Sequence, residues 1–171
     1  LRAQGYKGFY VAIGAQKSAK LRIPGEELEG VYGGVDFLRA VNLGHETHIG
    51  KRCAVIGGGN VAMDVTRSSI RLGADKVTCV YRRRQADMTA LPDEITGALA
   101  EGAELMTLAA PVRIEADEDG AAKALWVQPQ IIGEVDKAGR PRPSKAALEE
   151  VRIPADVIVV AIGQGVEIQG F

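Results

Sequence analysis

The sequence predicts an α/β fold in which a Rossmann-like parallel sheet carries an antiparallel β-meander. Two observations predict the parallel sheet: short apolar runs alternate with segments of helical spacing, and a glycine-rich turn at residues 57–60 joins one apolar run directly to a helix. A third observation predicts the meander. Beyond residue 110, apolar and polar residues alternate on both sides of the pair Asp119-Gly120, which is typical of a β-hairpin.

The first half of the chain is expected to hold two strands and two helices. The apolar run 9–13, which stops at Gly14, predicts a strand. Residues 35–41 have helical spacing and predict a short helix. The continuous apolar run 53–56 predicts a buried strand, and the helical pattern that follows it ends at Gly73.

The second half completes the parallel sheet and adds the meander. Residues 77–81 are β-branched and aromatic, so they predict a strand that closes a strand–helix–strand unit. Pro92 suits the first turn of a helix, which should end at Gly102. Strands are further expected at 105–108, 112–115, 125–127, 151–153 and 157–162, and an exposed excursion is expected at 133–143.

Composition excludes several classes of protein. The formal charge is −1 over 171 residues, so no global field favours nucleic acid or an anionic membrane. No apolar run approaches the ~20 residues of a bilayer span, and no signal peptide is visible, so we expect a cytoplasmic protein without nucleic-acid or membrane partners. Because the chain starts at Leu1 rather than at methionine, we also expect it to be a piece of a longer protein.

The glycine-rich turn predicts a dinucleotide site. Gly57, Gly59 and Ala62 form a G-x-G-x-x-A pattern directly after a strand and at the start of a helix. The first glycine turns the chain, the second leaves room for a pyrophosphate, and the alanine allows close helix–sheet packing. The N–H groups of Asn60 and Val61 should then face the ligand, with Gly58 inside the turn.

The end of the next strand predicts which nucleotide binds. NAD-binding folds place an acid about 20 residues beyond the turn, whereas this chain has Val80-Tyr81-Arg82-Arg83-Arg84 and no carboxylate until Asp87. Guanidinium groups pair with a 2′-phosphate, so NADPH is favoured over NADH. Consecutive side chains diverge, so one or two of the arginines, Arg82 and Arg83 first, should bind while another stays solvated.

The chain resembles a known family in stretches that cover nearly its whole length, among them VIGGGNVAMDVTRSSIRLGA, VYRRRQADMTALPDEI, IPGEELEGVYGGVDFLRAVN and ADVIVVAIGQ. It resembles the NADPH-dependent glutamate synthase small (beta) subunit and related FAD-dependent pyridine nucleotide oxidoreductases. The resemblance implies the fold of a two-dinucleotide-binding flavoprotein, in which an NADPH-binding domain is inserted into an FAD domain. It implies a linking strand and loop at 1–22, the NADPH-binding domain at 23–163, and a return to the FAD domain at 164–171.

The resemblance also implies an activity and its partners. Hydride would pass from NADPH to the flavin, and electrons would continue through iron–sulfur clusters of an iron–sulfur domain, with a large amidotransferase or synthase subunit as a further partner. FAD and the clusters would belong to the parent protein only, because this chain has one glycine fingerprint and two cysteines. We therefore expect the fragment to bind NADPH without turnover.

Site residues follow from the same resemblance. Residues 59–62 would contact the pyrophosphate, Arg82 and Arg83 the 2′-phosphate, and Asp64 would lie toward the nicotinamide, although a helix-surface carboxylate is an equal reading of Asp64. The nicotinamide side would be formed by Ala161, Ile162 and Gly163. One departure concerns the phosphate grip: the Met-Pro-Ala common in the family appears here as Met88-Thr89-Ala90.

Competing interpretations are weaker. A short-chain dehydrogenase needs Tyr-x-x-x-Lys, and no tyrosine here has a lysine four residues on. A disulfide reductase needs paired thiols, whereas Cys53 and Cys79 are separate and should be buried in strands. His45 and His48 fit solvated loop positions better than a metal site. A module that binds or senses NADP without catalysis stays open.

Overall fold

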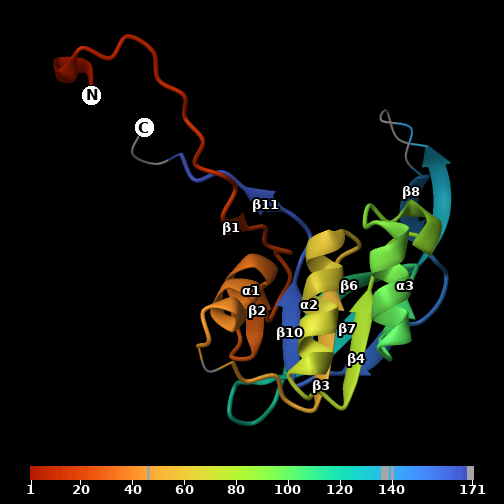
Figure 1. Cartoon of the computed structure of the whole chain (residues 1–171). Helices are drawn as coiled ribbons and strands as arrows, with labels where there is room; N and C mark the ends of the chain where they lie inside the picture. Colours follow the sequence, from red (N-terminus) through yellow and green to blue (C-terminus); the bar gives the residue numbers. More distant parts are fainter. Residues whose placement is uncertain (46, 136–138, 140, 169–171) are drawn as a thin grey trace.

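The computed structural model describes residues 1–45, 47–135, 139 and 141–168, and its centre is a five-stranded parallel sheet (Figure 1). The strands lie in the order β2-β10-β3-β4-β5, and every neighbouring pair is parallel. Their bounds are β2 Val31–Gly33, β3 Arg52–Ile56, β4 Lys76–Val80, β5 Glu104–Met106 and β10 Val157–Val160.

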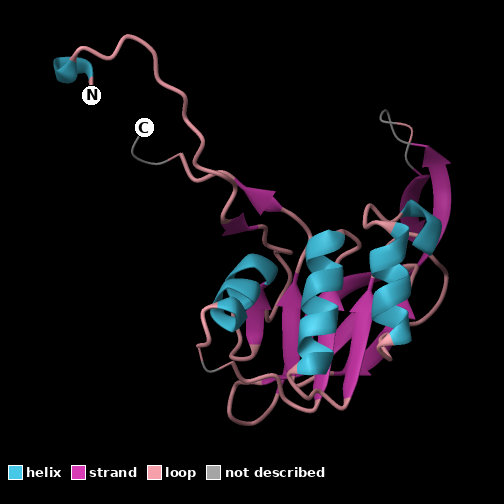
Figure 2. Cartoon of the chain, in the orientation of Figure 1, coloured by secondary structure: helices cyan, strands magenta, loops and turns pink. Residues whose placement is uncertain are grey.

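Three helices cover one face of this sheet and a meander covers the other (Figures 1 and 2). The helices are α1 Gly34–Asn42, α2 Asn60–Arg71 and α3 Pro92–Ala100. The antiparallel strands are β6 Ala109–Ala116, β7 Ala122–Val135, β8 Pro141–Lys145 and β9 Val151–Pro154. No helix among the described residues is long and apolar enough to cross a membrane.

The side chains of β3 show how the three layers are held together. Cys53 and Val55 belong to the core cluster on the helix side, whereas Ala54 and Ile56 belong to the cluster against the meander. All four are at most 3% exposed. A strand covered on both faces needs apolar residues at every position, which is why the sequence reads here as a continuous apolar run.

The connectivity creates a crevice beside β3. From β3 the chain proceeds through α2 to β4 and through α3 to β5 on one side, whereas β10 lies on the other side of β3. The ends of β3 and β10 are level, because Ile56 is paired with Val160. Where the connections after two neighbouring parallel strands run in opposite directions, a crevice opens at the carboxyl edge of the sheet. Ligands of open α/β sheets bind in this crevice.

The predicted fold class and most of its elements are confirmed. The helices begin and end within a few residues of the positions expected from glycine, proline and helical spacing. The strands expected near 53, 77, 105, 112, 125, 151 and 157 correspond to β3, β4, β5, β6, β7, β9 and β10.

The strand expected at residues 9–13 is wrong for this chain. These residues have no regular structure, and Phe9, Tyr10 and Val11 are 47%, 96% and 60% exposed. A strand needs a hydrogen-bonded neighbour, and this segment has none in the described part of the chain. Upstream lies only a short 3-10 helix, Arg2–Gln4, and the first pairing is made by β1, Lys17–Ser18, antiparallel to β11, Gln164–Gly165.

The excursion expected at 133–143 is also partly wrong. Strand β7 continues to Val135, and β8 begins at Pro141 and returns along it, with Ile132 opposite Pro143. Prolines interrupt a strand only where their missing N–H is not needed, and β8 pairs with β7 alone, as an edge strand. Residues 136–138 and 140 of the expected excursion, and 169–171 of the expected return segment, lie outside the described residues.

Candidate nucleotide-binding site

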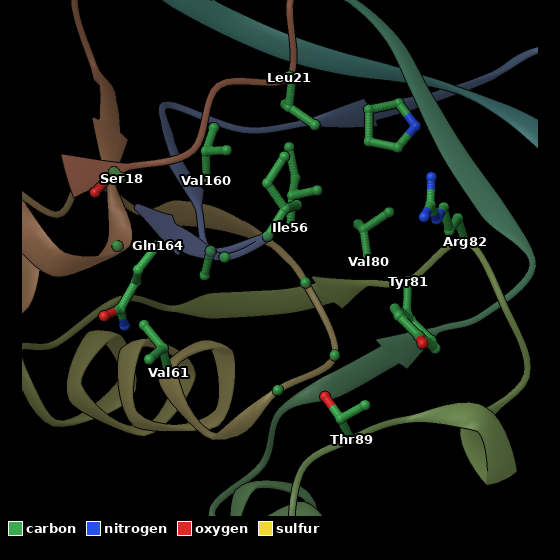
Figure 3. Close-up of a pocket in the computed structure, with 18 of the residues that line it drawn as sticks. Ser18, Leu21, Ile56, Val61, Val80, Tyr81, Arg82, Thr89, Val160 and Gln164 are labelled. Atoms are coloured by element: carbon green, nitrogen blue, oxygen red, sulfur yellow. The ribbon is translucent and has the colours of Figure 1, made fainter. Parts of the chain in front are cut away.

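A cleft of about 570 Å³ opens at the carboxyl edge of the parallel sheet, where β3, β4 and β10 end. Ten of the twelve predicted site residues line this cleft, namely Gly57, Gly58, Gly59, Asn60, Val61, Arg82, Arg83, Ala161, Ile162 and Gly163. In Figure 3, Arg82 and Tyr81 lie at one end of the cleft, and Ser18 and Gln164 lie at the other. The cleft is therefore elongated from the tip of β4, past the glycine turn, to the tip of β10.

Gly57 is required by the backbone. Its φ of 152° lies in a region that side chains avoid, and a Cβ atom here would lie 2.2 Å from the carbonyl oxygen of Ala161. Its N–H donates to the carbonyl of Val80 at 3.0 Å. Gly57 thus holds the turn between the ends of β4 and β10, and its role is to shape the site.

Gly58 is required by an aromatic neighbour. A Cβ atom on Gly58 would lie 2.5 Å from Cε2 of Tyr81, so the tyrosine ring packs directly on the glycine. The Tyr81 hydroxyl donates to the carbonyl oxygen of Asp87 at 2.9 Å, and the Gly58 carbonyl accepts the N–H groups of Thr89 and Ala90. These contacts tie the glycine turn to the segment that follows the arginines.

Gly59 differs, because almost nothing of the protein occupies the space beside it. Its φ is −103°, which any residue can adopt, and a Cβ atom here would meet only Thr89 Oγ1, at 3.4 Å. The neighbouring N–H groups of Asn60 and Val61 make no hydrogen bond to the part of the chain that the structure describes. Open space beside free N–H groups at a helix start suits an anion.

Ala62 and Asn60 hold the first turn of α2 against the rest of the fold. Ala62 is fully buried, and its N–H donates to the Gly59 carbonyl at 3.0 Å, so it lies under the cleft rather than in its wall. The Asn60 side chain accepts the N–H of Leu91 through Oδ1 at 2.9 Å, which joins α2 to the start of α3. The placement of Ala62 fits the close helix–sheet packing that the sequence predicts.

The three consecutive arginines have three different environments. Arg84 pairs with Asp87 through Nε and Nη2 at 2.8 and 2.9 Å, and Arg83 donates from Nε to the carbonyl of Pro141 at 3.1 Å. Arg82 is exposed and has no hydrogen bond or ion pair to any residue that the structure describes. The hydrogen bonds from Arg84 hold the pKa of the Asp87 carboxyl below its usual value. The charge of the first acid after β4 is therefore already compensated by an arginine.

Asp64 is not brought to the cleft. It is exposed on α2, and it does not line the cavity. Partial burial and the nearby Glu94 raise the pKa of its carboxyl, whereas Arg67 opposes them. The structure therefore places Asp64 on the surface of α2, outside the cleft.

The far end of the cleft is fixed by backbone contacts. The N–H of Ala161 donates to the Ile56 carbonyl at 2.8 Å, and the Gly163 carbonyl accepts the N–H of Ala19 at 3.0 Å. Ser18 donates to the carboxylate of Asp36 at 3.1 Å. Sequence reasoning missed several lining residues because they arrive from distant segments without a motif: Ser18, Leu21, Ile23, Gly34, Val35, Ala110, Pro111 and Gln164.

The two cysteines and two histidines do not line the cleft. His45 and His48 are exposed loop residues, and no group of three or more His, Cys, Asp or Glu side chains suited to a metal occurs among the described residues. Cys53 and Cys79 are unpaired and each 2% exposed. Burial raises the pKa of Cys53 to about 11 and that of Cys79 to about 12, from an ordinary 9.0.

These thiols should be inert until the protein unfolds. Because a raised pKa keeps the reactive thiolate scarce at neutral pH and both sulfurs are buried, we expect a water-soluble disulfide reagent to label neither cysteine within minutes at pH 7.5. Unfolding in guanidinium chloride should then release both thiols. Rapid labelling of either cysteine in the folded chain would contradict this placement, and a time course with and without denaturant measures it.

Comparisons with known proteins show the family. A family model described as pyridine nucleotide-disulphide oxidoreductase matches residues 2–171. Among similar proteins, the beta subunit of an NADP(+)-dependent formate dehydrogenase from Moorella thermoacetica is 40% identical over 95% of this chain and 23% of its own length. The small chain of an NADPH glutamate synthase from Halomonas elongata is 36% identical over 92% of this chain and 35% of its own length.

Solved structures show the same fold. FprA from Mycobacterium tuberculosis, solved in complex with NADPH, superimposes with a TM-score of 0.74 at 21% identity and covers 93% of this chain and 50% of its own. Thioredoxin reductase from T. acidophilum gives a TM-score of 0.62 at 17% identity, over 88% of this chain and 42% of its own. The chain spans roughly a quarter to a third of the length of the two curated relatives described above.

Proposed function

Because the chain belongs to the pyridine nucleotide-disulphide oxidoreductase family, we propose that it is the NADPH-binding unit of an FAD-dependent oxidoreductase. One observation carries the proposal: in the same cleft, the N–H groups beside Gly59 and the guanidinium of Arg82 have no hydrogen-bond partner among the residues that the structure describes. NADPH has two separate anionic groups in need of such partners, the pyrophosphate and the 2′-phosphate. Relatives whose names include NADP(+) or NADPH support NADPH as the nucleotide.

The residues suggest how the nucleotide lies. The pyrophosphate would take the open space beside Gly59, and the N–H groups of Asn60 and Val61 would donate to it. The 2′-phosphate would lie against Arg82, with Arg83 next to it as a second, partly engaged guanidinium. The nicotinamide would then extend toward residues 161–163. Asp64 is left out of this binding mode, because it lies outside the cleft.

NADPH supplies a hydride when bound, and this chain's residues bind and orient it. The wall at 161–163 and the side chains of Ser18 and Gln164 border the end of the cleft at which the nicotinamide would lie. The exposed apolar segment 9–13 would find its partner strand in the FAD domain, because the resemblance implies that residues 1–22 of this chain link the two domains. We retain residues 23–163 as the proposed NADPH-binding domain and 164–171 as the proposed return segment.

The chain's own residues do not fit the other redox groups. The single glycine fingerprint is taken by NADPH in this proposal, so FAD would be held by the rest of the parent protein. An iron–sulfur cluster needs about four thiolates, whereas this chain has two cysteines, both buried in strands. Clusters and the final acceptor would therefore belong to other domains or subunits, such as a large synthase subunit.

Calorimetric titration of the 171-residue chain tests the proposal. NADPH should bind at least about tenfold more tightly than NADH, because one charge-assisted contact to the extra phosphate is worth about 1.5 kcal/mol or more. Absorbance at 340 nm should not fall in the same sample, since no flavin is bound to accept hydride. Failure to bind NADPH would overturn the proposal, and equal affinities for the two nucleotides would overturn the role of the arginines.

A further inference from the structure

The hydroxyl group of Thr89 faces the glycine turn across the opening of α2. Its Oγ1 lies 3.4 Å from the position that a methyl group on Gly59 would take, and Thr89 lines the cleft. Figure 3 shows this oxygen directed toward the turn, on the side opposite Val61. The hydroxyl thus borders the same open space as the free N–H groups at the start of α2.

The backbone holds Thr89 firmly in this place. The N–H of Thr89 donates to the Gly58 carbonyl at 2.9 Å, and the N–H of Ala90 donates to the same oxygen at 3.0 Å. The ring of Tyr81 also packs on Gly58, and its hydroxyl donates to the carbonyl of Asp87, two residues before Thr89. The backbone at Thr89 is therefore held beside the glycine turn before any ligand arrives.

A purely structural role does not account for the hydroxyl. Threonine often caps a helix, but the N-cap of α3 is Leu91, and the N–H of Leu91 is taken by the side chain of Asn60. Thr89 Oγ1 has no hydrogen bond to any residue that the structure describes, and the residue is exposed. The hydroxyl is thus a free donor beside a space suited to an anion.

We propose that Thr89 is a ligand of the nucleotide's pyrophosphate and supplies a hydroxyl donor from the side opposite α2. This inference rests on the proposed function and adds to it a residue that the glycine motif does not contain. Family members with Met-Pro-Ala have proline at this place, which can donate from neither a hydroxyl nor an N–H. The chain would therefore hold the pyrophosphate with one more contact than such members.

The test compares Thr89→Val, which removes the hydroxyl at nearly constant shape, with Thr89→Ser, which keeps it. Two probes separate the phosphates: 2′-phospho-ADP-ribose has the pyrophosphate, and adenosine 2′-monophosphate lacks it. We expect Thr89→Val to weaken NADPH and 2′-phospho-ADP-ribose about tenfold. Binding of adenosine 2′-monophosphate should change less than twofold, and Thr89→Ser should restore NADPH affinity to within about threefold of the original.

Several outcomes would overturn the inference. Unchanged NADPH affinity in Thr89→Val would mean that the hydroxyl touches no ligand. An equal loss for adenosine 2′-monophosphate, or no recovery in Thr89→Ser, would mean that the substitution disturbs the cleft as a whole. If Thr89→Val folds poorly, Thr89→Ala takes its place and should show the same loss of NADPH affinity, about tenfold. If the unaltered chain binds no NADPH, the proposed function itself fails, and this inference fails with it.

Discussion

Gly59→Ala is expected to weaken NADPH binding at least about 100-fold while the chain stays folded. The methyl group would occupy the space in which a pyrophosphate meets the N–H groups of Asn60 and Val61, and two lost charge-assisted hydrogen bonds account for about 3 kcal/mol or more. The protein itself can accept the change, because φ is −103° and the nearest atom, Thr89 Oγ1, would lie 3.4 Å away.

Thermal unfolding provides the matching measurement. Alanine is a poorer N-cap than glycine, but it also restricts the unfolded chain, so the two effects offset each other to within about 1 kcal/mol. For a domain of this size, the unfolding temperature should move by no more than about 4 °C. NADPH binding within threefold of the original, in a folded Gly59→Ala variant, would show that no phosphate approaches this residue.

Gly57→Ala is the matched control in the same turn. It makes the same chemical change two residues away, but φ is 152° and the new methyl would lie 2.2 Å from the carbonyl oxygen of Ala161. Strain and overlap of this kind cost about 2 to 4 kcal/mol. We expect Gly57→Ala to lower the unfolding temperature by several degrees or more. The pair thus separates the glycine that shapes the fold from the glycine that admits the ligand.

Much of the fold could be predicted because local pattern and tertiary environment agree. Strand β3 lies between two layers, so its burial on both faces appears in the sequence as an unbroken apolar run. The turn at Gly57 is equally visible, since only glycine accepts its backbone conformation. In both cases the local environment, burial on two faces or an unusual backbone conformation, restricts which residue types fit, so the residue types predict the structure.

Prediction failed where a distant partner decides the outcome. Residues 9–13 have the composition of a strand, yet they stay unpaired because no neighbouring strand lies beside them in the described chain. Strand β8 contains two prolines and still forms, because it needs pairing on one edge only. The sequence placed Arg82 and Arg83 ahead of Arg84 but could not separate these two, since the carbonyl of Pro141 that engages Arg83 comes from a distant strand.

The ranking of the arginines leads to the second large effect. Arg82→Glu is expected to weaken NADPH binding about 100-fold or more, because a contact to the 2′-phosphate is replaced by repulsion between like charges. NADH has a free 2′-hydroxyl, which can donate a hydrogen bond to a carboxylate, so its affinity should stay within a few-fold. The preference between the two nucleotides would thereby be reversed. Titration of both nucleotides at two salt concentrations measures the effect.

Two comparisons make this result specific to Arg82. Arg83→Ala should cost NADPH affinity less, because Arg83 already donates to the carbonyl of Pro141. Lys7→Glu carries the same change in charge on an exposed residue outside the cleft, so it should leave both affinities unchanged once salt screens the general field. If Arg83→Ala proved the more damaging, the 2′-phosphate would lie nearer to β8 than proposed. If Lys7→Glu matched Arg82→Glu, net charge rather than a contact would set the preference, and the assignment of Arg82 would be lost.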